Sequence, residues 1–161
     1  MSPLGSLTRP RPARTLSTMQ LVHATTVEID GHAALLRGPS GSGKSDLALR
    51  LVDGGAVLVA DDQTELTAEG GRLFASAPSA IAGLLEVRGL GIVRVPHRDR
   101  VPLALVADLA TGGEVERLPD PASAAFLGVT VPLVRLHAFE ASAVAKVRLA
   151  IRSATRDIMG A

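Results

Sequence analysis

The chain has no cysteine, tryptophan or tyrosine and no marked excess of charge, and these absences exclude several classes of protein. Without cysteine it can form neither a disulfide framework nor a thiolate metal site. Its three phenylalanines are too few for a nucleic-acid surface built on base stacking. The balance of 17 Lys and Arg against 16 Asp and Glu gives no electrostatic reason to bind DNA, RNA or a membrane surface.

Length and hydropathy indicate a globular domain. The 161 residues, 47% of them apolar, suffice for one domain with a buried core. No uncharged apolar run approaches the roughly 18 residues of a transmembrane helix. Residues 1–18 hold three Pro and three Arg without apolar periodicity, and they lack the apolar stretch of a secretion signal. We therefore expect a disordered tail over 1–18, one domain over 19–161 and a cytoplasmic location; a targeting peptide is the alternative for the tail.

Short apolar runs separated by turn residues predict many strands. Asp30-Gly31 and Gly70-Gly71 predict tight turns between strands. A helix is expected over 46–52, because four of its apolar residues share one face and two glycines follow it. The expected strands are 21–29, 33–36, 57–60, 64–67, 72–75, 92–95, 103–107 and 129–136.

The clearest helix is expected from about Ser142 to Met159. Its apolar stripe follows helical spacing and consists of Val144, Val147, Ile151, Ala154 and Ile158. An opposite basic stripe, formed by Arg148, Arg152 and Arg156, is either a solvated face or a surface for a partner. Together these elements predict a single α/β domain with a mixed sheet and a C-terminal helix.

A phosphate-binding loop is the strongest functional signal. The segment Gly38-Pro39-Ser40-Gly41-Ser42-Gly43-Lys44-Ser45 matches G-x-x-x-x-G-K-[ST], and it lies between an expected strand and an expected helix. Glycines let successive backbone N–H groups face phosphate oxygens, and the helix N-terminus adds its positive dipole end. Lys44, one of two lysines in the chain, would reach the β- and γ-phosphates, and the Ser45 hydroxyl could ligate Mg²⁺.

Three further positions are candidates for the same site. Asp61-Asp62 follow the expected strand 57–60, where a P-loop protein carries a carboxylate near the metal, so at least one of them is expected to act there. Because adjacent strand residues face opposite ways, one of the two suffices. Glu86 stands among apolar residues before Gly89 and Gly91, which indicates a close-approach loop or, alternatively, an exposed pair with Arg88.

These segments, in this order, resemble the catalytic domain of HPr kinase/phosphorylase, a bacterial family that phosphorylates a serine of the phosphocarrier protein HPr. The resemblance runs from His23 to about Leu136 and rests on the glycine-rich loop, on Val59-Ala60-Asp61-Asp62, and on Leu85 to Ile92, which resembles the family signature L-E-[IV]-R-G-[LV]-G-[IV]. The short architecture is similar to the truncated form found in alphaproteobacteria.

The resemblance implies ATP and Mg²⁺ as cofactors and a role for each matching residue. The family's general base falls on Asp62, and its phosphate-binding lysine falls on Lys44. Its Mg²⁺ ligands fall on Ser45 and Glu86. Its active-site histidine falls on His23, although from the residues alone His23 reads as a packed or exposed strand residue.

Two further expectations depend on the resemblance. A catalytic arginine of the family best matches Arg117, in Glu116-Arg117-Leu118. The basic, Pro/Gly-containing loop tied to dephosphorylation should fall near 136–142, where this chain has no Lys, Arg or Gly. Family members form hexamers, so a homo-oligomer is possible.

The leading hypothesis is an ATP-dependent protein-serine kinase acting on HPr or an HPr-like carrier, with little phosphorylase activity. A kinase of the same fold with a small-molecule acceptor is the first alternative. A nucleotide-sensing module that binds ATP and hydrolyses it poorly is the second. The sequence does not separate them, because acceptor choice depends on surface shape.

Overall fold

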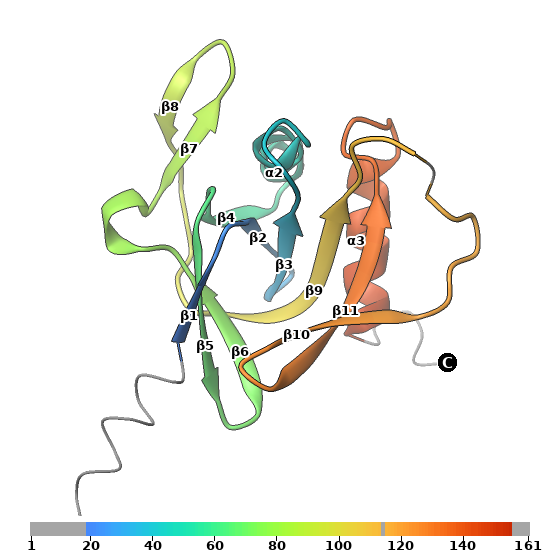
Figure 1. Ribbon diagram of the computed structural model, residues 1–161. Helices are drawn as coiled ribbons and strands as arrows, with labels where there is room; N and C mark the ends of the chain where they lie inside the picture. Colours follow the sequence, from blue (N-terminus) through green and yellow to red (C-terminus); the bar gives the residue numbers. More distant parts are fainter. Residues whose placement is uncertain (1–18, 114, 156–161) are drawn as a thin grey trace, which may run out of the picture.

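A computed structural model of the chain describes residues 19–113 and 115–155, so the tail expected over 1–18 lies outside the described residues. A curled mixed sheet forms the centre, two helices pack against it, and a two-stranded hairpin stands away from it (Figure 1). The elements are β1 Met19–Val22, β2 Thr25–Ile29, β3 His32–Arg37, α2 Lys44–Asp53, β4 Val57–Ala60, β5 Thr64–Glu69, β6 Arg72–Ser76, the 3₁₀ turn η2 Ser79–Ile81, β7 Leu84–Val87, β8 Gly91–Arg94, β9 Val101–Leu109, β10 Ala122–Phe126, β11 Val129–Leu136 and α3 Ala143–Ala154.

Three parallel strands organise the sheet. β9 pairs in parallel with β3 on one side and with β11 on the other. β2 and β4 continue the sheet beyond β3 with antiparallel pairs, and β10 pairs with β11 at the other edge. The antiparallel strands β1, β5 and β6 join the start of β9 through β6. The predicted α/β domain with a mixed sheet is confirmed.

β3 is buried on both faces, which explains its uninterrupted apolar run. Ala34 and Leu36 belong to the core cluster that includes the inward faces of α2 and α3. Ala33 and Leu35 belong to a second cluster, which includes residues of β5, β6 and β10. All four residues are fully buried, so the strand that leads into the glycine-rich loop is fixed from both sides.

Helix α2 begins at Lys44, directly after the left-handed Gly43, and so starts two residues earlier than predicted. Leu47, Ala48 and Leu51 are buried against the sheet, as their spacing predicts. The helix ends at Gly54, whose backbone N–H donates to the carbonyls of Arg50 and Leu51.

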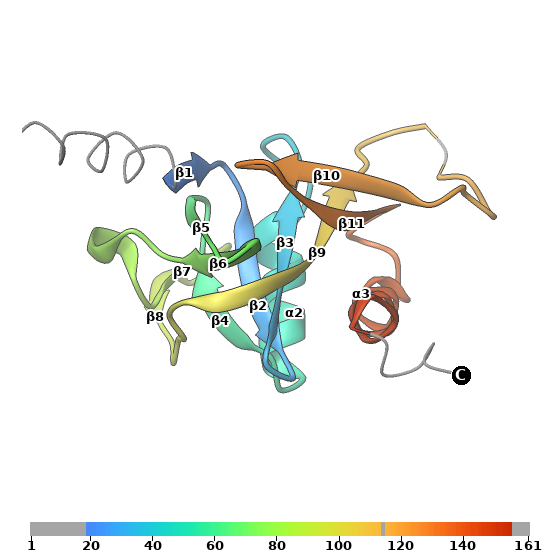
Figure 2. The same cartoon turned by 90° about the horizontal axis from the view of Figure 1, so that it is seen from below.

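Helix α3 lies beside β11 and is seen end-on in Figure 2. Its buried face carries Val147 and Ile151 of the predicted apolar stripe, whereas residues 156–159 of the expected helix lie outside the described residues. Arg148 of the basic stripe donates from Nη2 to the carbonyl of Leu51 at 3.3 Å, so it links α3 to the end of α2. Arg152 is exposed. Among the described residues no helix is long and apolar enough for a membrane crossing.

The turns at Asp30-Gly31 and Gly70-Gly71 are confirmed. All four residues have positive φ, between 50° and 88°, as in the tight turns that match the twist of paired strands. The expected strand 21–29 is wrong as one element, because it breaks between β1 and β2 at His23 and Ala24.

Two strands escaped the sequence analysis. β7 lies where a close-approach loop was expected, and it pairs with β8 in the separate hairpin. β10 is built mostly of Ala and Ser, which have weak strand propensity. Its turn to β11 consists of Leu127 and Gly128 at φ 51° and 81°, and because a leucine rarely adopts this conformation the turn signal was weak.

The buried apolar side chains on β3 should carry much of the stability. We expect Leu36→Ala to lower the free energy of unfolding by about 2–5 kcal/mol, because it leaves a cavity in the core. Leu149→Ala, on the exposed side of α3, is the matched control and should change it by less than about 0.5 kcal/mol. Urea denaturation of the two variants and the parent chain gives both values. An equal loss of unfolding free energy in the two variants would contradict the assignment of Leu36 to the core.

Candidate active site

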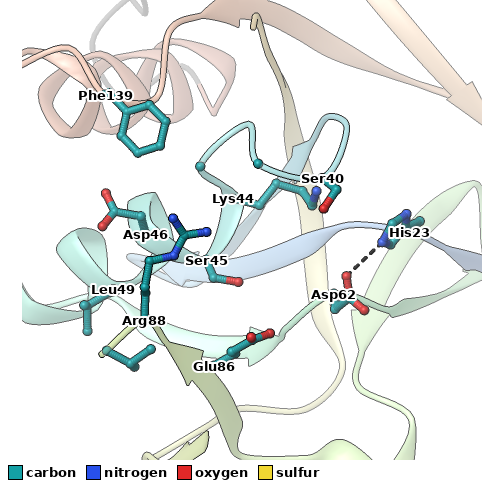
Figure 3. Close-up of a pocket in the computed structure, with 13 residues that line it drawn as sticks. His23, Ser40, Lys44, Ser45, Asp46, Leu49, Asp62, Glu86, Arg88 and Phe139 are labelled. Atoms are coloured by element: carbon teal, nitrogen blue, oxygen red, sulfur yellow. Dashed lines mark hydrogen bonds and ion pairs between the residues drawn. The ribbon is translucent and has the colours of Figure 1, made fainter. Parts of the chain in front are cut away.

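Four strands bring their carboxyl ends to one edge of the sheet. β3, β9 and β11 are parallel, and β4 runs in the same direction because two antiparallel pairings through β2 separate it from β3. Open α/β sheets bind ligands at this edge. Here residues 38–45 follow β3, Asp61-Asp62 follow β4, and a cavity of about 420 Å³ lies between them (Figure 3).

The glycine-rich loop is shaped by close approaches at two glycines. At Gly43, φ is 100° and an added Cβ would lie 2.7 Å from the Cβ of Ala138 and 2.9 Å from the Phe139 ring. At Gly38 an added Cβ would lie 2.6 Å from the Ser42 hydroxyl oxygen, which is buried without a hydrogen-bond partner among the described residues. The loop therefore requires glycine at both positions for steric reasons.

Lys44 lies at the first position of α2 and is 8% exposed. Its ammonium group donates to the carbonyl of Gly38 at 2.7 Å and to that of Pro39 at 3.2 Å. The amine thus lies on the loop itself, next to the positive end of the α2 dipole. Such a concentration of donors and positive charge suits a phosphate group.

Asp61 is the best-connected polar side chain of the site. It is 8% exposed, and its Oδ1 accepts hydrogen bonds from the hydroxyls of Thr25 at 3.0 Å and Ser45 at 2.7 Å. Its Oδ2 accepts from the backbone N–H of Glu86 at 2.9 Å. The carboxylate therefore holds β2, α2 and β7 against the end of β4.

Asp62 faces a different environment from its neighbour. The N–H of Gln63 donates to the carbonyl of Asp61 at 2.7 Å across Asp62, whose φ is 69°. This is the γ-turn with positive φ at its centre, the rarer and more strained form. Asp62 is 65% exposed and its Oδ1 lies 2.8 Å from Nε2 of His23 (Figure 3). The two acids thus separate through a strained turn and not through strand alternation.

Glu86 and Arg88 come from the β7–β8 hairpin and line the opposite wall of the cavity. Leu85 and Val87 are buried beneath the hairpin, so the alternation of strand β7 leaves Glu86 exposed on the cavity side. Figure 3 shows the Glu86 carboxylate and the Arg88 guanidinium pointing into the cavity from this strand and the turn after it. The expected loop is a strand end, but its glutamate does reach the site.

The side chains present fit a magnesium ion that shares phosphate ligands. Ser45, Asp61 and Glu86 offer hydroxyl and carboxylate oxygens, the hard donors that this ion prefers. Within residues 19–113 and 115–155, no three His, Asp or Glu side chains cluster closely enough to hold a metal alone. Proteins usually bind magnesium with one or two carboxylates, water and substrate phosphates, which agrees with this donor set.

An ion pair fixes the strands beneath the glycine-rich loop. Arg37, the residue before Gly38, donates from Nε and Nη2 to the two carboxylate oxygens of Asp108 at 2.7 and 3.1 Å. This two-pronged hydrogen bond raises the pKa of Arg37 above its ordinary value. It joins the last residue of β3 to β9 directly before the glycine-rich loop begins.

The structure brings together His23, Lys44, Ser45, Asp62 and Glu86 but not Arg117. Arg117 is exposed in the segment between β9 and β10 and does not line the cavity. Figure 1 shows this segment on the side of the molecule away from the β7–β8 hairpin. The sequence analysis also missed Thr25 and left Asp61 undecided. Neither role was visible locally, because both depend on hydrogen bonds between residues that lie 16 to 37 positions apart in the chain.

Comparison with known proteins shows the family to which the chain is similar. Residues 14–151 match the family model described as "HPr Serine kinase C-terminal domain". The HPr kinase/phosphorylase of Chlorobium phaeovibrioides is 40% identical over 136 residues, which are 76% of this chain and 41% of that protein. That of Clostridium tetani is 41% identical over 97 residues, 60% of this chain and 31% of that protein. The chain thus spans well under half the length of these relatives.

A solved structure has the same fold. The Hpr(Ser) kinase/phosphatase of Coxiella burnetii superimposes with a TM-score of 0.77 and 26% sequence identity. The match covers 88% of this chain and 93% of that one. The similarity therefore extends over most of the chain.

The close approach at Gly43 can be tested against Gly41, which shares its positive φ but has no atom within 4 Å of an added Cβ. Both Gly→Ala variants strain the backbone, and only Gly43→Ala collides with Ala138 and Phe139. We expect Gly43→Ala to lower the free energy of unfolding by about 1–3 kcal/mol more than Gly41→Ala does, the usual range for overpacking. Thermal and urea unfolding measure the difference. Equal destabilisation would show that the loop does not pack against residues 138–139.

Proposed function

The chain belongs to the family of HPr serine kinase C-terminal domains, and we propose that it transfers the γ-phosphoryl group of ATP to a serine of HPr or an HPr-like phosphocarrier protein. The observation that carries the proposal is the division of the acid pair beside the glycine-rich loop. Asp61 is buried and bonded to Ser45, whereas Asp62 is exposed and has only His23 as a side-chain partner among the described residues. Phosphoryl transfer to a hydroxyl uses one carboxylate near the metal ion and a second one that accepts the proton of the hydroxyl.

Asp62 is the proposed general base. The acceptor serine oxygen attacks the γ-phosphorus in line, its proton passes to the Asp62 carboxylate, and the bond to the β-phosphate oxygen breaks to leave ADP. An exposed carboxylate can be reached by a side chain of another protein, which a buried one cannot. His23, 2.8 Å from Asp62, orients the carboxylate.

Lys44 and the loop amides are proposed to hold the phosphates. The ammonium group of Lys44 lies on the loop and would neutralise charge on the β- and γ-phosphates. Ser45, Asp61 and Glu86 would hold Mg²⁺ with the nucleotide, Ser45 and Glu86 as ligands and Asp61 through its hydrogen bond to Ser45. The ion, when bound, supplies Lewis-acid neutralisation of the phosphate charge.

The remaining parts of the proposal rest on the family. The relatives are named for HPr, and we propose such a carrier as the partner, with a cytoplasmic location and no contact with nucleic acid or membrane. Arg117 does not line the cavity of its own chain. We propose a catalytic role for it only in a homo-oligomer, where the segment between β9 and β10 would reach the cavity of a second copy.

The direct experiment uses γ-labelled ATP, Mg²⁺ and purified HPr, followed by mapping of the labelled residue. The proposal requires label on a serine of HPr and none on the Ser→Ala form of that carrier. Label on a small acceptor instead would indicate a metabolite kinase. Stoichiometric nucleotide binding without transfer to any acceptor would indicate a nucleotide sensor.

The role of Asp62 gives a sharper prediction. Asp62→Asn keeps the shape of the side chain and removes the proton acceptor, so kcat for transfer should fall by roughly 10²-fold or more while the Kd for ATP stays unchanged. Asparagine also tolerates positive φ, so the turn at 62 should persist. Steady-state transfer and calorimetric ATP binding measure the two quantities. A loss of ATP binding would assign Asp62 to the phosphate site instead.

The charge distribution also bears on the reverse reaction, in which phosphate removes the phosphoryl group from phosphoserine. Bringing these anions together requires added positive charge or a backbone anion nest. The segment after β11 contributes His137 and Glu140 instead. Lys146 donates to Glu140 Oε1 at 2.9 Å, a hydrogen bond that lowers the pKa of Glu140, so the charge of this lysine is already paired.

We therefore expect little phosphorylase activity. Incubation of serine-phosphorylated HPr with the protein, Mg²⁺ and millimolar phosphate, without ATP, should release pyrophosphate far more slowly than the forward reaction phosphorylates HPr. Comparable rates would refute this expectation. They would also show that Arg88 and Lys44 alone supply enough positive charge.

A further inference from the structure

Phe139 is an exposed aromatic side chain that the proposed mechanism does not use. It is one of three phenylalanines in the chain, and 68% of its surface is accessible. It lies in the loop that joins β11 to α3, and it lines the cavity that holds Lys44, Asp62 and Glu86. A phenylalanine ring beside a ligand cavity gains free energy when a flat apolar group stacks on it and removes it from water.

The ring lies against the glycine-rich loop itself. Its Cζ and Cε2 atoms are 2.9 and 3.2 Å from the position of a Cβ on Gly43, one residue before Lys44. The ring atoms Cζ and Cε2 thus lie next to Gly43, while most of the Phe139 side chain stays accessible. A group stacked on the ring would lie within a nucleoside's reach of phosphates bound to residues 38–45.

The direction of a bound nucleotide follows from the position of the acids. The γ-phosphate must lie near Asp62, at one end of the cavity, so the nucleoside extends towards the other end. Figure 3 shows Phe139 at the end opposite to His23 and Asp62. In the strand order, β11 and the loop after it lie beyond β3 and β9, at the opposite end from β4, whose carboxyl end leads into the two acids.

There is open space beside the ring for a purine. Phe139 also lines a second cavity of about 370 Å³, with Gly41, Ala110 and Thr111 at the ends of the neighbouring loops. Phe139 and Gly41 line both cavities, so open space adjoins this side chain in each of them.

We propose that Phe139 is the stacking platform for the nucleobase of the nucleoside triphosphate, an inference that rests on the proposed function because it takes that ligand as the phosphoryl donor. Every base presents a π-face, so stacking contributes affinity without strong discrimination. ATP, GTP and CTP should therefore bind with similar affinities, purines somewhat more tightly than CTP. This platform concerns one bound nucleotide and not a polynucleotide surface.

The test compares ATP with inorganic tripolyphosphate, which has the same phosphate chain and no base. By calorimetry with Mg²⁺ present, Phe139→Ala should weaken ATP binding by about 5- to 100-fold, the range for loss of one base–aromatic stack. Tripolyphosphate should bind the variant and the parent chain within twofold. Leu149→Ala, which removes another exposed apolar side chain away from the cavity, should change neither affinity.

Unchanged ATP affinity in Phe139→Ala overturns the proposal. Equal weakening of ATP and tripolyphosphate also overturns it, because Phe139 would then act only by supporting the loop at Gly43. Failure of the parent chain to bind either ligand is a separate result, seen before any variant is made, and it refutes the proposed function together with the platform.

Phe139→Trp gives a second readout that does not depend on affinity. The chain has no other tryptophan or tyrosine, so its fluorescence would report on position 139 alone. We expect ATP to quench this fluorescence and tripolyphosphate to leave it unchanged, with ATP affinity retained because the larger ring still stacks. Quenching of equal size by both ligands would place the base elsewhere.

Discussion

The structure of the site depends on one carboxylate, that of Asp61. Three donors from separate elements converge on it: the hydroxyl of Thr25 on β2, the hydroxyl of Ser45 on α2 and the backbone N–H of Glu86 on β7. An ionised carboxylate only accepts hydrogen bonds. All three donors therefore point towards Asp61, the residue that follows β4. Asp61 is only 8% exposed, so water can hardly replace a lost hydrogen bond, and removing any of the three donors would lower the stability of the fold.

The position of Asp62 follows from that anchor. Thr25 donates to Asp61 and accepts from the backbone N–H of Asp62, so it fixes both residues of the pair. The chain then turns at Asp62 with positive φ, a conformation that costs of order 1–3 kcal/mol and persists only where the surroundings impose it. The result is one acid bound to Ser45 of the glycine-rich loop and one acid presented to solvent beside His23.

The sequence predicted the parts of the site that depend on local pattern. The loop 38–45, the apolar run of β3 and the amphipathic face of α2 are encoded within a few residues, and the structure contains all three. The placing of Glu86 on a strand could not be read locally, because β7 is defined by its pairing with β8 and by the burial of Leu85. The division between Asp61 and Asp62 depends on Thr25, 36 residues away, which no local pattern could indicate.

The central claim is that adjacent acids perform different tasks, one on the metal side and one on the acceptor serine. The most direct measurement is the Mg²⁺ dependence of transfer to HPr, at saturating ATP, in Asp61→Asn and Asp62→Asn. Asp61→Asn should raise the half-saturating Mg²⁺ concentration by about 10- to 100-fold, the range for loss of a group that orients a metal ligand. Asp62→Asn should leave that concentration at the value of the parent chain and lower only the maximal rate. A shifted Mg²⁺ dependence in Asp62→Asn, with none in Asp61→Asn, would contradict the account.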